Sequence, residues 1–314
     1  MTHTNPTDTH FDRALMPRLS HTRPVESVGA LIERCARALV RGKVFFGHGT
    51  VSARDEAAEL VFFAAGIEHA LGASAYARRL SPPTVARIEA LLKRRIAERL
   101  PLPYLTHRAF FAGLEFYVDE RVLVPRSPIA GLIVEKFAPW IAPRRVRRIV
   151  DLGTGSGAIA LACAKAFPKA RVDALDISSE ALEVCRRNIR RMRLARRVQT
   201  LRSDYFAAVS GRRYDIIVSN PPYVGRAEMR ALPPEYRHEP RLGLAAGNDG
   251  LDAVRAIFAA APHHLENDGI LVVEVGNTEA ALLRAFPRMR FVWPEISMGG
   301  GGVFILHARD LVAG

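Results

Sequence analysis

The turn Asn220-Pro221-Pro222-Tyr223 contains the residue types with the most specific chemical use in this sequence. It follows the apolar run 214–219, which predicts a buried strand. Two successive prolines have no N–H groups and stiffen the turn, so the carbonyl oxygens of Asn220 and Pro221 can point away from the sheet. The side-chain oxygen of Asn220 and the carbonyl of Pro221 would then form an acceptor pair that holds both hydrogens of a planar NH₂ group.

A planar NH₂ group is a poor nucleophile because its lone pair is delocalised into the attached carbonyl or ring. An acceptor pair on its two hydrogens would direct that lone pair at an electrophile, and alignment of this kind supplies about 7 to 11 kcal/mol. No strong base is then needed before attack. We therefore predict that Asn220, Pro221, Pro222 and Tyr223 are the catalytic residues. Tyr223 would lie against the flat substrate group, or alternatively pack beneath the turn.

A glycine-rich loop about seventy residues earlier predicts a cofactor site. The segment 151–157 (DLGTGSG) follows an apolar strand and leads into an apolar helix. Glycines at such a bend let the backbone approach a ligand closely. With Ala158 the loop also satisfies a loose dinucleotide pattern, and Asp176 lies where an NAD-binding carboxylate would lie. The loop alone therefore does not distinguish NAD from S-adenosylmethionine.

Two carboxylates extend this predicted cofactor site. Asp176 ends the second strand, where it can accept both ribose hydroxyls, although it could instead cap the next helix. Asp204 follows the third strand and can meet an adenine amino group, while Tyr205 offers a ring to the adenine face. The predicted cofactor-binding residues are Gly153, Thr154, Gly155, Ser156, Gly157, Asp176, Asp204, Tyr205 and Asn220, the last shared with the catalytic turn.

Strands and helices alternate after residue 147, which predicts a mostly parallel sheet with helices on both faces. The last two strands are too close together for a helix between them, so we expect them to form a closing antiparallel hairpin. The seven expected strands are 148–151, 171–176, 198–202, 214–219, 270–275, 291–295 and 303–307.

Helical periodicity dominates the residues before the sheet. One helix is expected from Val28 to Gly42, one after Ser52 and one from Ser81-Pro82 to Pro101, where serine and proline mark helix starts. Around residues 110–118 the period changes to two, which predicts a hairpin. We therefore divide the chain into a disordered leader (1–24), a helical substrate-recognition domain (25–105), a hairpin linker (106–126) and a catalytic domain (127–314).

Composition places the chain among cytoplasmic globular proteins. Of its 314 residues, 49% are hydrophobic and 25% charged, and no apolar run approaches the roughly 18 residues of a membrane span. The three cysteines have no metal-site or disulfide spacing, so neither a metal nor a disulfide is expected. The net charge of +13 comes mostly from arginine. The arginines either attract RNA phosphates or form an ordinary solvated surface.

The glycine loop followed by the Asn-Pro-Pro-Tyr turn resembles the HemK-type protein glutamine N5-methyltransferases, whose hallmark is a DLGTGSGAIA-like segment followed by NPPY. The resemblance covers nearly the whole chain after the leader. It implies a class I S-adenosylmethionine-dependent methyltransferase fold, with a Rossmann-like mixed seven-stranded sheet, an antiparallel last strand and a small N-terminal helical domain. It also implies that residues 153–157 hold the methionine end of the cofactor, and that residues 220–223 hold a glutamine amide.

Within that family, three segments are most similar to the branch that modifies the third protein of the large ribosomal subunit. They are 46–50 (FGHGT) with 55–57 (DEA), 116–128 (FYVDERVLVPRSP), and 235–240 (EYRHEP) before 243–247 (GLAAG). Arg126 and Ser127 replace the PRxxTE-like run of the release-factor branch. Arg126, His238 and Glu239 would either contact the substrate or form a salt-linked structural loop.

Three alternatives remain open at this point. The release-factor branch shares the chemistry. An amino methyltransferase acting on adenine or guanine in RNA or DNA would use the same acceptor pair and would benefit from the positive charge, but it would need aromatic wedges beyond Tyr223 for base flipping. A noncatalytic RNA-binding assembly factor is the third. We also expect the enzyme to bind the ribosomal protein either as a free protein or within an assembly intermediate that contains ribosomal RNA.

Overall fold

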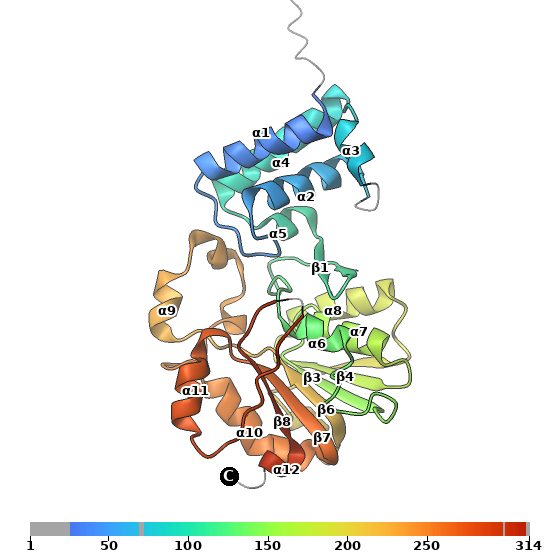
Figure 1. The fold of residues 1–314 in the computed structure, drawn as a ribbon, viewed down its shortest axis with the longest axis vertical. Coiled ribbons are helices and arrows are strands. Elements are labelled where there is room, and N and C mark those ends of the chain that lie inside the picture. Colours follow the sequence, from blue (N-terminus) through green and yellow to red (C-terminus); the bar gives the residue numbers. More distant parts are fainter. Residues whose placement is uncertain (1–25, 69–71, 298, 312–314) are drawn as a thin grey trace, which may run out of the picture.

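The computed structural model describes residues 26–68, 72–297 and 299–311, so the expected leader lies outside the described residues. A group of helices lies at one end of the molecule and a sheet with helices on both faces at the other (Figure 1). A short hairpin connects the two parts, and none of the described helices is long and apolar enough to cross a membrane.

Serine caps start two helices of the N-terminal domain where the sequence predicts them. The Ser27 hydroxyl accepts the Ala30 N–H at 3.3 Å, and the Ser52 hydroxyl accepts the Asp55 N–H at 3.1 Å. The short helices α3 and α5 were not predicted, because five residues are too few to show a helical period. The helices are α1 (Val28–Arg41), α2 (Ala53–Ala65), α3 (Ala73–Ala77), α4 (Pro82–Glu98) and α5 (Leu102–Thr106).

The predicted hairpin consists of β1 (Ala109–Phe111) and β2 (Leu114–Phe116), which pair antiparallel. Asn188 of helix α8 (Ser179–Arg191) fixes its position. This fully buried side chain accepts the Tyr117 N–H at 2.8 Å and donates to the carbonyls of Tyr117 and Ser156, each at 2.9 Å. One amide thereby joins the linker to the glycine loop.

Six strands of the described chain form the main sheet in the order β5-β4-β3-β6-β7-β8. Neighbours are parallel except β8, which is antiparallel to β7 as predicted. Strand order reverses between β3 and β6, which is where an open α/β sheet forms its ligand crevice. The strands are β3 (Arg148–Leu152), β4 (Arg171–Asp176), β5 (Val198–Arg202), β6 (Tyr214–Ser219), β7 (Leu265–Glu274) and β8 (Val303–His307).

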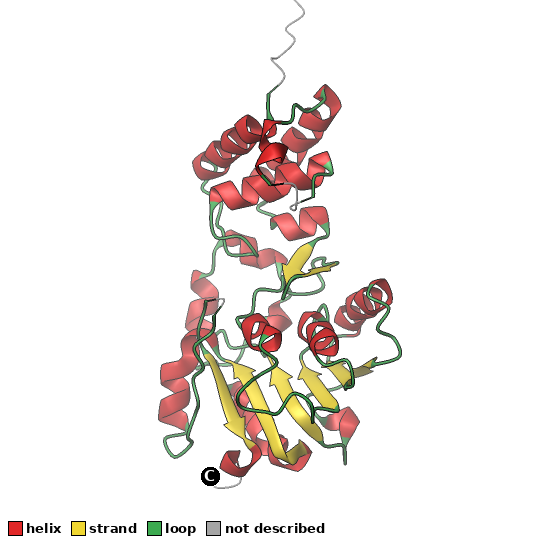
Figure 2. Ribbon diagram, turned by 45° about the vertical axis from the view of Figure 1, so that its right-hand side comes forward, coloured by secondary structure: helices red, strands yellow, loops and turns green. Residues whose placement is uncertain are grey.

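Alternating side chains of the strands build two separate cores. Ile149 and Ile216 pack with α7 on one face, whereas Val150 and Ile217 pack with α10 on the other. Figure 2 shows helices on both sides of the sheet. Besides α8, the helices of this domain are α6 (Ile129–Val134), α7 (Ala158–Ala166), α9 (Arg226–Ala231), α10 (Asp252–His264), α11 (Glu279–Ala285) and α12 (Ala308–Leu311).

The expected seventh strand, 291–295, is not a strand in the structure. Only Val292 pairs, exchanging backbone hydrogen bonds of 3.1 and 2.8 Å with Ile305 of β8. Pro294 has no N–H at the position two residues on, where the next pair of ladder bonds would form. The segment therefore adds one antiparallel bridge at the sheet edge, so the hairpin geometry is present without a seventh strand.

Candidate active site

A cavity of about 660 Å³ lies at the carboxyl ends of the parallel strands and collects most of the predicted site residues. The glycine loop, the ends of β4 and β5 and the turn after β6 line it on the sheet side. The linker residues 120–127 and residues 240–245 line its other side. Those last residues belong to the segment between β6 and α10, which includes α9 and reaches toward the helical domain (Figure 1).

The glycine loop leaves open space toward this cavity. Gly153 and Gly155 have φ values of 71° and 54°, and a Cβ added to either would meet no atom within 4 Å. Hydrogen bonds on the side away from the cavity hold the loop: the buried Asp151 accepts the Thr154 hydroxyl at 2.6 Å and the Ala160 N–H at 3.1 Å. Burial raises the pKa of Asp151 to about 7. Asp151 therefore supports the loop from inside the protein.

Asp176 lines the cavity and is fixed by the backbone. Its carboxylate accepts the Gly155 N–H at 2.8 Å and the Ser178 N–H at 2.9 Å. Burial raises its pKa, although the backbone hydrogen bonds partly counteract this. The cap of the following helix is Ser178, whose hydroxyl accepts the Ala181 N–H, and not Asp176.

The remaining predicted cofactor residues divide into two groups. Thr154, Ser156, Asp204 and Tyr205 line the cavity, and Tyr205 has an unusual positive φ of 42°. Gly157 does not line it. A Cβ on Gly157 would lie 2.6 Å from the Cys185 sulfur, so the structure explains this glycine by the close packing of α7 against α8.

The lining residues fit S-adenosylmethionine, which the loop and turn imply. The open cradle at Gly153 and Gly155 can accept the methionine end of the molecule, and Asp176 can accept hydroxyl hydrogens of a ribose. Asp204 and Tyr205 stand at the end of the next strand, where the adenine would lie. These residues are in the same cavity as the Asn220 turn, so donor and acceptor sites are contiguous.

The turn 220–223 faces the cavity with all four residues. Ser219 ties it to the glycine loop, since its hydroxyl donates to the Leu152 carbonyl at 2.8 Å. Asn220 is half-buried, and within the described part of the chain its side chain makes no hydrogen bond, so its amide is available to a substrate. The structure thus places the predicted turn at the cavity, and the acceptor pair stays a prediction.

Glu274, at the end of β7, is a site residue that the sequence analysis missed. Tyr223 donates its phenol hydrogen to Glu274 Oε1 at 3.0 Å, and Ser127 donates to Glu274 Oε2. Burial raises the pKa of this carboxyl. Gly276 lies beside the Tyr223 ring, because a Cβ there would come within 2.5 Å of it. A carboxylate directly after the buried run 270–273 was the available signal.

Arg126, which is partly exposed, pairs with the buried Glu239 beside the cavity. Both guanidinium nitrogens of Arg126 donate to Glu239, and the Val124 N–H adds a bond of 3.0 Å. Burial alone would raise the pKa of Glu239, but Arg126 and His48 lower it to about 2. Arg126 also lines the cavity, so this pair links residues 124–126 to Glu239 and forms part of the cavity wall.

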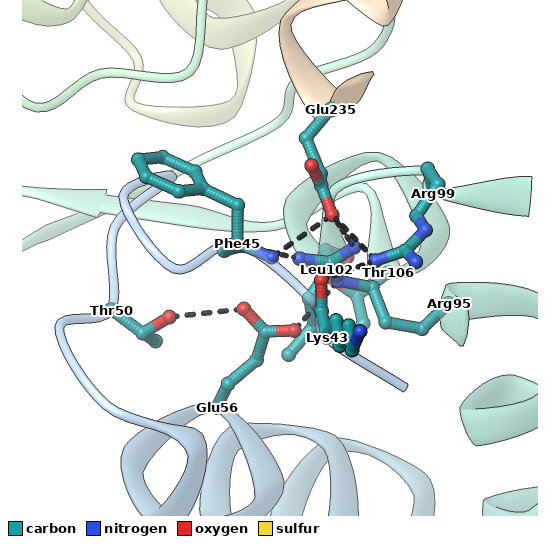
Figure 3. A network of polar contacts seen from close by, with 9 residues as sticks. All are labelled: Lys43, Phe45, Thr50, Glu56, Arg95, Arg99, Leu102, Thr106 and Glu235. Atoms are coloured by element: carbon teal, nitrogen blue, oxygen red, sulfur yellow. Dashed lines mark hydrogen bonds and ion pairs between the residues drawn. The ribbon is translucent and has the colours of Figure 1, made fainter. Parts of the chain in front are cut away.

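A second buried network joins the segment after α9 to the helical domain (Figure 3). Glu235 Oε1 accepts the Phe45 N–H at 3.0 Å and lies 3.4 Å from Arg95. Arg95 is fully buried and also donates to Glu56 at 2.6 Å and to the Phe45 carbonyl at 2.8 Å. His238 adds a contact of 2.9 Å to the Glu98 carbonyl. The side of the cavity formed by residues 240–245 is therefore anchored to the helical domain.

Comparisons with known proteins relate this chain to methyltransferases. Residues 132–232 match the family model described as "Methyltransferase small domain". A ribosomal protein uL3 glutamine methyltransferase of Xanthomonas campestris pv. campestris is 47% identical over 85% of this chain and 87% of that protein. One from Xylella fastidiosa (strain Temecula1) is 48% identical over 85% and 86%. A solved methyltransferase from Pyrococcus furiosus is 21% identical, covers 62% of this chain and 89% of that one, and has a TM-score of 0.45.

Proposed function

This chain belongs to the family of ribosomal protein uL3 glutamine methyltransferases, and on that premise we propose that it transfers a methyl group from S-adenosylmethionine to the side-chain amide nitrogen (N5) of a glutamine in uL3, the third protein of the large ribosomal subunit. The observation that carries the proposal is the unpartnered Asn220 side chain in the same cavity as the glycine loop. The fold is that of a class I methyltransferase.

The substrate amide is held by the turn. The Asn220 side-chain oxygen and the Pro221 carbonyl accept its two N–H groups, so its lone pair points into the cavity. Tyr223 covers one face of the flat amide, and Glu274 fixes the Tyr223 ring through the 3.0 Å hydrogen bond. Bound S-adenosylmethionine supplies an electrophilic methyl group on a positively charged sulfur.

Orientation carries most of this catalysis. Two hydrogens held at fixed acceptors leave the nitrogen little freedom, and the alignment replaces activation by a base. The N–C bond forms as the S–C bond breaks, which discharges the sulfonium, so a dry cavity favours transfer. The nitrogen afterwards loses one hydrogen as a proton to solvent. The Asn220 oxygen and the Pro221 carbonyl hold both hydrogens during methyl transfer, and one of the two is released when that proton leaves.

The arginine-rich face of α8 is compatible with a substrate that is already associated with RNA. Arg190 and Arg193 are exposed, whereas Arg187 stacks on the Tyr117 ring and Arg191 pairs with Glu115. Part of the expected patch is therefore used within the protein. We propose a cytoplasmic enzyme that methylates uL3 free or in an assembly intermediate, with faster transfer to the intermediate at low salt.

Incubation with methyl-labelled S-adenosylmethionine tests the function. Purified uL3, a release factor and ribosomal RNA are offered separately, and mass spectrometry locates the added methyl group. We expect label on one glutamine of uL3. Label on the release factor alone would assign the other branch, and label on RNA alone would overturn the protein substrate.

A further inference from the structure

A second cavity of about 390 Å³ adjoins the active-site cleft. The two cavities share Val124 and Pro125 as a common wall, so they are neighbours on one continuous surface. The helical domain supplies the opposite wall with residues 48–50, Phe63 of α2 and Thr106 of α5. This cavity therefore lies between the helical domain and the linker, beside the position of the substrate amide.

Aromatic rings and one cation form much of its surface. The Arg108 guanidinium carbon lies 5.7 Å from the Phe63 ring centroid and 5.5 Å from that of Phe110. Phe110 is 44% exposed and lies on the outer face of β1, whereas Ala109 and Phe111 on the other face are buried. Arg108 Nη2 pairs with Glu115 at 2.7 Å, whereas the Nε atom is buried without a hydrogen-bond partner among the described residues. An apolar group that also carries an acceptor would satisfy both features.

His48 lines the same cavity and is 2% exposed. Neither of its ring nitrogens has a hydrogen-bond partner among the described residues. Its Nε2 lies 3.6 Å from Glu239 Oε2, close enough for an ion pair, whereas no described charged group is placed against its Nδ1. A buried ring nitrogen without a hydrogen bond is costly in a native protein, so Nδ1 is the atom of this wall that a polar group from outside the chain would satisfy.

We propose that this second cavity binds an apolar side chain of the methyl-accepting polypeptide, together with a backbone polar group that reaches His48. The proposal rests on the proposed function and names how the same active site recognises its protein substrate. In an extended polypeptide, side chains two or four residues apart point to the same side. The bound side chain would therefore lie about two to four residues from the methylated glutamine.

Filling the cavity tests the proposal with intact uL3 as the probe. Thr106→Trp places an indole in the cavity, and Val134→Trp adds the same side chain at an exposed position of α6 as the control. We expect Thr106→Trp to raise KM for uL3 about tenfold, which is the effect of losing one buried apolar side chain. The affinity of Thr106→Trp for S-adenosylmethionine should equal that of the parent. Val134→Trp should have the parent KM for uL3.

A second variant keeps the test decisive if Thr106→Trp does not fold. Phe110→Ala removes part of the wall, and Leu283→Ala is its control because both side chains are 44% exposed. Only Phe110→Ala should raise KM. Residues of uL3 near the methylated glutamine are then replaced by alanine one at a time. One of these substitutions should raise KM with the parent enzyme but not with Thr106→Trp or Phe110→Ala. Such coupling would not arise from general loss of stability.

The outcomes separate the two proposals. If the parent enzyme methylates uL3 but Thr106→Trp and Phe110→Ala retain the parent KM, the cavity does not bind substrate and the inference is wrong. If no position in uL3 shows coupling to the cavity, the inference is equally wrong. A parent enzyme that does not methylate uL3 would overturn the proposed function, and the docking site with it.

Discussion

Tyr223 in the turn after β6 donates a hydrogen bond of 3.0 Å to Glu274 at the end of β7, so two neighbouring strands fix one ring of the active site. Glu274→Ala should lower kcat by roughly 100-fold, because displacement of a positioned group by about 1 Å has that effect. Glu274→Gln should retain most activity, since its amide oxygen can accept from Tyr223 and its NH₂ can donate to Ser127. Steady-state kinetics at saturating cofactor measures both.

This comparison distinguishes positioning from proton transfer. Tyr223→Phe should also lower kcat, by about tenfold, with unchanged cofactor affinity. If Glu274→Gln were as impaired as Glu274→Ala, the ionisable carboxyl itself would be required, and the positioning role would be rejected.

Removal of the Asn220 amide should separate binding from transfer. We expect Asn220→Ala to bind S-adenosylmethionine with nearly the parent dissociation constant, while methyl transfer falls by about two to three orders of magnitude. The reason is that one of the two acceptors of the substrate NH₂ group is lost, whereas the glycine loop and Asp176 are unchanged. Calorimetric titration and single-turnover rates provide the two measurements. Retained transfer would reject the acceptor-pair mechanism.

Cofactor affinity should decrease at acidic pH because of Asp176. Burial raises the pKa of this carboxyl, so protonation begins at a higher pH than for an ordinary aspartate. Only the carboxylate can accept both ribose hydroxyls, so the dissociation constant should rise as pH falls toward the raised pKa. In Asp176→Asn the dissociation constant for S-adenosylmethionine should rise by roughly tenfold or more. It should also no longer depend on pH in this range. A parent-like pH profile in the variant would refute the assignment.

Local patterns were sufficient to predict the sheet and the cleft. The strands β4, β5, β6 and β8 have their expected bounds; β6 and β8 are mainly apolar, whereas β4 and β5 mix apolar with polar residues. The glycine loop and the Asn-Pro-Pro-Tyr turn each follow a predicted strand. Since carboxyl ends of parallel strands share one edge, their meeting in one cavity followed from topology.

Long-range pairing could not be predicted in the same way. Glu274 contacts Ser127 across 147 residues, and Arg95 contacts Glu235 across 140. Neither pair has a local spacing, and each of the four residues looks like an ordinary polar or charged residue when its neighbours in sequence are considered. The prediction of a strand at 291–295 was wrong for a different reason. Its local composition is that of a strand, but Pro294 has no N–H to continue the ladder.

The neighbouring arginines of α4 should differ sharply in their effect on stability. Arg95 is fully buried among Glu56, Glu235 and the Phe45 carbonyl, as Figure 3 shows, whereas Arg94 forms an exposed pair with Glu98 on the same helix.

Arg95→Leu leaves the buried Glu56 carboxylate without a cation and Glu235 with Arg99 as its only described cation, so the free energy of unfolding should fall by about 3 to 5 kcal/mol. Arg94→Leu should have little effect, because water and salt screen its pair. Urea unfolding of both variants provides the measurement. Because Glu235 belongs to the segment that borders the cleft, Arg95→Leu should also raise KM for uL3 at temperatures where the protein is still folded. Equal stability of the two variants would show that the Arg95 network does not hold the helical domain to that segment.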